Sequence, residues 1–165
     1  MFKRISIALA IVLVLSLASG AWMSASASSA EVPFKAYYPV TAVATFDPSC
    51  GCIRQVFTPG GNGLGSHMGV SLFYGEAQAW PGNPIIQKGD GKLIAANGDY
   101  LTVYYEGTAV VIDGGAHIVT DGWYVITGGS GRFLNATGGG TYHVYVYNSG
   151  EKPNDLWFEG HLHNP

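Results

Sequence analysis

Glu106 and His67 are the two side chains of this sequence best placed for proton transfer. In the stretch LTVYYEGT, strand alternation puts Leu101 and Val103 on one face and Glu106 on the other. A Glu106 turned into an apolar interior would be a buried carboxyl group of the kind that an isomerase or cyclase uses as acid or base. The aliphatic face is favoured as the interior, which predicts an exposed Glu106. His67, in GSHMGV, could donate a proton at a cavity mouth, although a hydrogen-bonded structural role is favoured.

A second group of chemically capable residues lies near the end of the chain. In LWFEGHLHNP, Glu159, His161 and His163 share one face of an expected strand. Imidazole and carboxylate groups are common ligands of zinc and other transition metals. A polar outer face accounts for the same pattern and is favoured, so the sequence predicts no metal and no cofactor.

The cysteines Cys50 and Cys52 form the third group, in the stretch DPSCGCIRQ. Three interpretations remain open: a disulfide that rigidifies a turn, two thiols that contribute to a metal site, and two strand cysteines without chemistry. An exported chain meets an oxidising compartment, but a bridge between residues two apart closes a small ring. The sequence offers no second ligand pair at zinc-like spacing.

Residues 1–27 have the features of a secretory signal peptide. Lys3 and Arg4 precede an apolar run over residues 5–17, and the segment ends in Ala25-Ser26-Ala27, the pattern of a signal peptidase site. The apolar run is shorter than the roughly 20 residues that span a bilayer. We therefore expect a secreted protein, extracellular or periplasmic, with no membrane span after cleavage.

The composition predicts one all-β domain, over residues 31–165. Charged residues make up 12% of the 165-residue chain, below the roughly 25% of an average globular domain, and 24 residues are glycine. Eleven acidic residues face eight basic ones, two of which belong to the expected signal peptide. This balance argues against nucleic acid as a partner.

Alternating apolar residues bounded by turn residues predict eight strands. Asn97-Gly98 suits a two-residue type I′ turn between two of them. Eight short antiparallel strands favour a closed barrel, because closure removes exposed sheet edges. Residues 28–64 would supply its N-terminal strands and residues 65–165 its core. The predicted strands cover residues 38–46, 52–57, 67–79, 85–95, 100–112, 117–126, 141–147 and 156–163.

A glycine-rich segment over residues 125–146, VITGGSGRFLNATGGGTYHVYV, could bind a phosphate or reverse the chain. A phosphate loop opens a helix, whose N-terminus then faces the phosphate. A strand pattern follows Gly140 instead, so chain reversal is favoured. Alternation breaks at GRFLNATG, which predicts a single helical or 3₁₀ turn there, with Phe133 and Leu134 plugging one end of the barrel.

The segments GSHMGV, GDGKLIAANGDYLTVYYEG, YVITGGSGRFLNATGGGTYHVYV and LWFEGHL resemble the allene oxide cyclase barrel superfamily, which includes the dirigent proteins. The resemblance covers roughly residues 65–162 and is strongest to secreted bacterial members of unknown activity. It implies a calycin-like barrel of eight antiparallel strands with an apolar interior. The plant cyclases assemble as oligomers, which implies a homo-oligomer.

The resemblance implies no catalytic residue in this chain. The plant cyclases use a glutamate and an asparagine of the first strands, and residues 32–55 contain no Glu-x-Asn pattern that matches them. We expect a non-catalytic secreted barrel that binds a small apolar ligand or self-associates; the alternative is an isomerase or cyclase acting on a reactive apolar intermediate. Tyr104, Phe133 and Tyr145 are the aromatic residues expected to contact a ligand.

Overall fold

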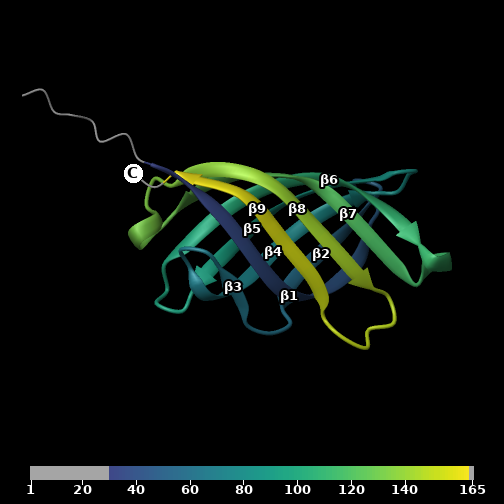
Figure 1. Cartoon of the computed structure of the whole chain (residues 1–165). Coiled ribbons are helices and arrows are strands. Elements are labelled where there is room, and N and C mark those ends of the chain that lie inside the picture. Colours follow the sequence, from purple (N-terminus) through teal and green to yellow (C-terminus); the bar gives the residue numbers. More distant parts are fainter. Residues whose placement is uncertain (1–29, 164–165) are drawn as a thin grey trace, which may run out of the picture.

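The computed structural model describes residues 30–163, which form antiparallel β-structure and two short 3₁₀ turns (Figure 1). The predicted signal peptide lies outside the described residues. Within them, no helix is long and apolar enough to cross a membrane. The elements are β1 Glu31–Asp47, β2 Cys52–Pro59, β3 Gly63–Gly65, β4 Gly69–Trp80, β5 Ile85–Ala95, β6 Tyr100–Ile112, η1 Asp113–Gly115, β7 His117–Gly129, η2 Gly131–Phe133, β8 Thr137–Tyr147 and β9 Asn154–His163.

The strands pair as a single antiparallel sheet whose hydrogen bonds run in a ring of eight strands. From β4 to β9 each strand pairs with the next along the chain, and β9 pairs with β1. The two segments β2 and β3 share one place in the ring, between β1 and β4, with β3 toward one end and β2 toward the other. The all-β prediction is confirmed.

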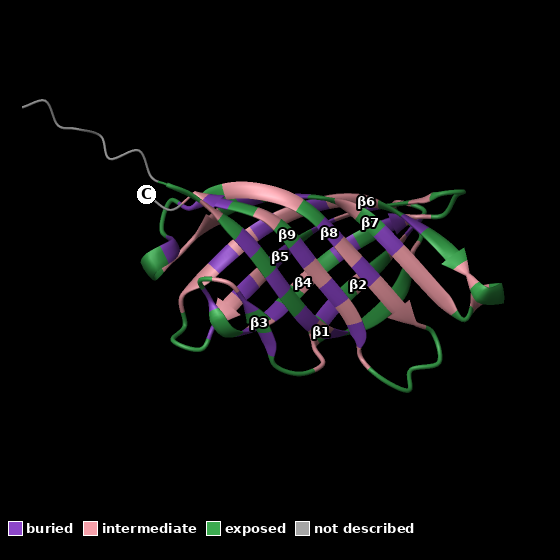
Figure 2. Cartoon of the chain, viewed as in Figure 1, coloured by how far each residue is buried: buried purple, intermediate pink, exposed green. Residues whose placement is uncertain are grey.

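Alternation along the strands gives the ring an apolar interior. In β1, Phe34, Ala36, Tyr38 and Val40 are buried while their neighbours are partly or fully exposed. Figure 2 shows the same alternation as bands of buried and accessible residues along the strands. Residues two apart share a face of a strand, so each strand contributes every second side chain to the core.

Glycines on the inner face make room for large aromatic rings. A Cβ atom added to Gly75 or Gly91 would lie within 3 Å of the Phe73 ring. A Cβ atom added to Gly107 or Gly122 would lie equally close to Tyr142. Because these strand positions carry no side chain, the ring of Phe73 or Tyr142 can lie over them.

Several predicted boundaries need correction. The strand predicted from residue 38 begins at Glu31, and the one predicted from residue 141 begins at Thr137, because glycines 138–140 pair with β9 as regular strand residues. The short strand β3 was not predicted.

The turn type predicted at Asn97-Gly98 is wrong. Among the described residues, Gly98 has a positive φ of 89° and Asn97 has none, whereas a type I′ turn needs both. The amide of Gly98 donates to the carbonyl of Ala95, and the amide of Ala95 donates to Asp99. The hairpin therefore has a three-residue loop with a left-handed glycine.

Candidate functional site

One end of the ring is covered by η2. Phe133 of this turn is only 1% exposed and belongs to the core, while the neighbouring Leu134 is 59% exposed. The predicted 3₁₀ turn is confirmed, and Phe133 plugs the end as expected. Leu134 does not, because it leaves the turn in an extended conformation that points it outward.

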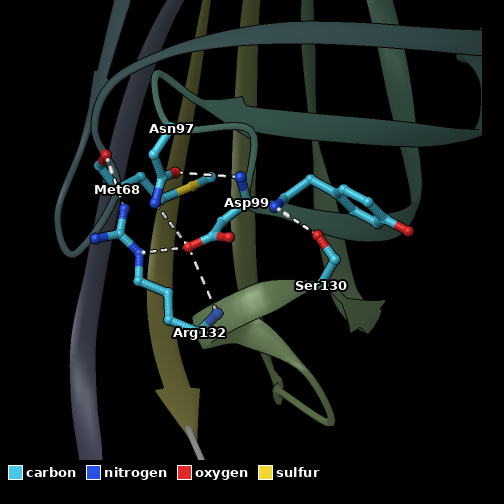
Figure 3. Close-up of polar contacts among 6 residues, drawn as sticks. Met68, Asn97, Asp99, Ser130 and Arg132 are labelled. Atoms are coloured by element: carbon cyan, nitrogen blue, oxygen red, sulfur yellow. Dashed lines mark hydrogen bonds and ion pairs between the residues drawn. The ribbon is translucent and has the colours of Figure 1, made fainter.

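Polar contacts hold η2 against the neighbouring turns (Figure 3). The carboxylate of Asp99 lies 3.6 Å from Nε of Arg132, and Nη2 of Arg132 donates to the carbonyl of Met68 at 3.3 Å. The hydroxyl of Ser130 accepts the backbone N–H of Tyr100 at 3.2 Å. This end of the ring is therefore fastened by hydrogen bonds from three turns.

The middle of the ring is filled with side chains. Phe73, Phe158, Tyr105 and Tyr142 pack against one another there, with ring centroids 5.3–6.4 Å apart. The cavity left among them has a volume of about 10 Å³. That is room for one water molecule at most, so a ligand cannot occupy the middle.

The other end of the ring is an open cup with a volume of about 610 Å³. The ends of β1, β2 and β4 to β9 surround it, and the loop between β8 and β9 forms part of its rim. Its wall is mostly apolar and includes Val40, Ala79, Ile85, Ala109 and Ile118. Alanines at wall positions leave the space that larger side chains fill in the middle of the ring.

Neutral polar side chains cross the floor of the cup. The hydroxyl of Tyr142 lies 3.4 Å from Oε1 of Gln87, and Nε2 of Gln87 donates to Oε1 of Gln55. The two glutamines belong to β5 and β2, which are separated by β4. Ala77 and Ala79 of β4 are small enough to let the amides meet above them.

A carboxylate fixes the rim of the cup from outside. Asp155 accepts hydrogen bonds of 2.7 Å from the hydroxyls of Tyr37 and Tyr147, and Nζ of Lys152 lies 3.6 Å away. Partial burial by itself would raise the pKa of Asp155, but these hydrogen bonds and the lysine hold it below its ordinary value. The β8–β9 loop is thereby tied to β1 and β8.

The two residues proposed for proton transfer lie outside the cup. Glu106 is on the outer face of β6, where its carboxylate is 3.1 Å from Nζ of Lys88. His67 is exposed in the turn between β3 and β4, with φ of 63° and Nε2 3.1 Å from the carbonyl of Pro33. The structure thus places Glu106 on the outer face, as the favoured interpretation expected, and His67 in an exposed turn with a hydrogen bond to the backbone.

The three aromatic residues expected to contact a ligand do not line the cup either. Phe133 is in the plug at the opposite end. Tyr104 and Tyr145 point outward, because the inward positions of β6 are odd-numbered and those of β8 are even-numbered. On the outer surface their rings pack against Trp123 and His117.

His161 and His163 lie on the outer face of β9 beside Glu31. Nδ1 of His161 is 3.4 Å and Nε2 of His163 is 3.9 Å from the same carboxylate oxygen. Residues 30–163 contain no group of three or more side chains that could hold a metal ion.

Cys50 and Cys52 are joined by a disulfide at the turn between β1 and β2, with their Cα atoms 5.2 Å apart. Cys52 is fully buried and Cys50 is partly buried. Of the three interpretations left open by the sequence, the structure has the disulfide.

Sequence reasoning missed the polar residues of the cup: Gln55, Gln87, Thr120 and Asn154. A signal for Gln87 was present in the sequence, because it shares the inward phase of β5 with Gly89 and Leu93. Gln55, Thr120 and Asn154 likewise occupy inward positions of their strands. Polar residues in an otherwise apolar phase need hydrogen-bond partners, which other side chains, water or a ligand can supply.

Comparison with known proteins gives no match to a family model, to a curated protein or to a solved structure.

Proposed function

We propose that this protein binds a small, mostly apolar molecule in the open cup. The observation that carries the proposal is a cup of about 610 Å³ with a mostly apolar wall and a few neutral polar side chains at its floor. Small-molecule sites in proteins are typically about 300–1,000 Å³, largely apolar, and contain a few polar groups that orient the ligand. The cup has these properties.

The chemistry of the lining favours binding over catalysis. Among the described residues of the lining, the side chains with acid–base chemistry are Tyr147, Glu151 and Lys152, all on the β8–β9 side of the rim. The floor and wall offer neutral amides and hydroxyls. An isomerase or cyclase acting at the floor or wall would have to work by shape and hydrogen bonding, so the alternative function has less support.

The fold and location proposed with this function are those expected from the sequence. We propose a closed, calycin-like barrel of the allene oxide cyclase type, secreted after removal of residues 1–27. The ring of eight strands and the 3₁₀ turn at the glycine-rich segment support it. The homo-oligomer stays a prediction.

The fluorescence of N-phenyl-1-naphthylamine, which rises in apolar surroundings, tests binding in the cup. Ala109 is buried in the wall and faces the cup, so Ala109→Phe should occupy ligand space and weaken binding by about tenfold or more. The adjacent Val110 is 45% exposed on the outer face, and Val110→Phe serves as the matched control. Equal binding by both variants, or no binding by the natural sequence, would overturn the proposal.

A further inference from the structure

Asn154 presents a free hydrogen-bond donor to the cup. Its Oδ1 accepts the backbone N–H of Tyr147 at 3.0 Å, and this bond fixes which side of the amide group carries the oxygen. The Nδ2 group has no hydrogen-bond partner among residues 30–163, and Asn154 lines the cup. Its two N–H bonds are therefore available to a ligand.

The floor offers a second donor of the same kind. Because Oε1 of Gln87 accepts from the Tyr142 hydroxyl, Nε2 of Gln87 is the group that donates to Gln55. Gln55 consequently accepts through Oε1, and its Nε2 has no partner in the described part of the chain. The amide oxygens of both glutamines thus accept hydrogen bonds, and Nε2 of Gln55, which lines the cup, keeps its N–H groups free.

Thr120 adds a hydroxyl on the wall. It is a buried residue of β7 that lines the cup, and its side chain makes no hydrogen bond to another described residue. Within residues 30–163, the Tyr124 hydroxyl is the one fully enclosed side-chain polar atom without a hydrogen-bond partner, so the unpartnered hydroxyl of Thr120 is not fully enclosed. Thr120 can therefore donate to a molecule in the cup.

Resting on the proposed function, we infer that the ligand is uncharged and carries an oxygen acceptor, such as a carbonyl, at the end that enters the cup. Each of these three neutral donors can pair with an acceptor oxygen, and the side-chain oxygens of Asn154, Gln55 and Gln87 already accept hydrogen bonds. A charged group beside these donors would lose its hydration, because Thr120, Asn154 and Gln55 supply no opposite charge. The charged lining residues Glu151 and Lys152 lie on the rim, where Lys152 is paired with Asp155. A pure hydrocarbon would leave the donors unpaired.

Competition against N-phenyl-1-naphthylamine distinguishes these ligand classes. Decan-2-one, decane, decanoate and decylammonium have chains of the same length and differ in the group at one end. Decan-2-one should displace the dye about tenfold more effectively than each of the other three. Displacement by decanoate, decylammonium or decane that equals the ketone would overturn the inference while leaving the cup as a binding site. Absence of dye binding would overturn the proposed function and the inference together.

Two substitutions test the named donors. Thr120→Val keeps the shape and removes the hydroxyl, whereas Asn154→Asp keeps the acceptor for Tyr147 and removes the N–H groups. Each substitution should weaken the binding of decan-2-one about three- to tenfold and leave the binding of decane unchanged. Thr108→Val, on the exposed outer face of β6, is the matched control. A loss that is equal for ketone and decane, or no loss in either variant, would contradict the assignment of the donors.

Discussion

The hydroxyl of Tyr142 on β8 reaches Gln87 on β5, at 3.4 Å, by crossing two intervening strands. The intervening positions in the register are Gly122 on β7 and Gly107 on β6. A Cβ atom on Gly122 would lie 2.5 Å from the tyrosine ring, and one on Gly107 would lie 2.6 Å from the hydroxyl. The floor of the cup therefore exists because two adjacent strands lack a side chain at this level.

Gly122→Ala should destabilise the protein by more than about 2 kcal/mol, because the new methyl group meets Tyr142 and a backbone oxygen of β6 that cannot move aside. Gly114→Ala is the comparison: Gly114 has φ of 65° but open space around it, so the cost is conformational, about 1 kcal/mol. Urea unfolding measures both. An equal loss of stability in the two variants would show that the position of the Tyr142 ring does not depend on the missing side chain at Gly122.

Four buried tyrosines should make the fold sensitive to alkali. Burial raises the pKa of Tyr38 to about 12, and it raises the pKa of Tyr105, Tyr124 and Tyr142 as well. A folded-state pKa above the unfolded value of about 10 means that the unfolded chain releases its proton first. Stability is then full below pH 10 and falls as the pH rises toward 12.

Absorbance of tyrosinate, followed together with circular dichroism, checks this expectation. The four buried tyrosines should ionise only together with the loss of β-structure. Ionisation of these four tyrosines while the β-structure persists would contradict the burial of their rings.

Strand phase could be predicted from the sequence because it depends on neighbouring residues. The alternation of Leu101 and Val103 with Glu106 was enough to place the carboxylate outside, and the structure has it there beside Lys88. The break at GRFLNATG was enough to predict the 3₁₀ turn. Both features are local, so one chain segment contains the information.

The cup could not be predicted in the same way. The level of a residue along the axis of the ring depends on the register in which its strand pairs with the neighbouring strands. Gln55 and Gln87 meet because β2 and β5 pair with opposite edges of β4, whose small residues lie between them. Period-two patterns show which face a residue occupies and do not show which residues of distant strands share a level. Tyr104 and Tyr145 were proposed as ligand contacts because they are aromatic, although the alternation along their strands places them on the outer face.

Tyr124→Phe should stabilise the protein by about 1 kcal/mol. The Tyr124 side chain is 1% exposed, and its hydroxyl has no hydrogen-bond partner among residues 30–163. The change removes a desolvated polar group and keeps the ring against Phe158.

Tyr105→Phe should destabilise the protein, because the Tyr105 hydroxyl donates a hydrogen bond to the carbonyl of Glu76 at 3.1 Å, and the substitution removes this bond. Thermal unfolding of the two variants gives the comparison. A loss of stability in Tyr124→Phe would show that its hydroxyl has a partner.

Asp99→Ala should loosen the plugged end without changing the cup. The carboxylate accepts from Nδ2 of Asn97 at 2.9 Å and pairs with Arg132, and its side chain is 22% exposed. Losing these contacts should cost about 1–2 kcal/mol in urea unfolding. Asp90→Ala is the control, since Asp90 is exposed on β5 and forms no salt bridge with another described residue.

Dye affinity of the folded Asp99→Ala protein should match that of the natural sequence, because the filled middle of the ring separates the Asp99 contacts from the cup. Equal stability of the Asp99→Ala and Asp90→Ala variants would show that these contacts contribute nothing. Weaker dye binding by folded Asp99→Ala protein would instead show that the two ends of the ring are coupled through its aromatic core.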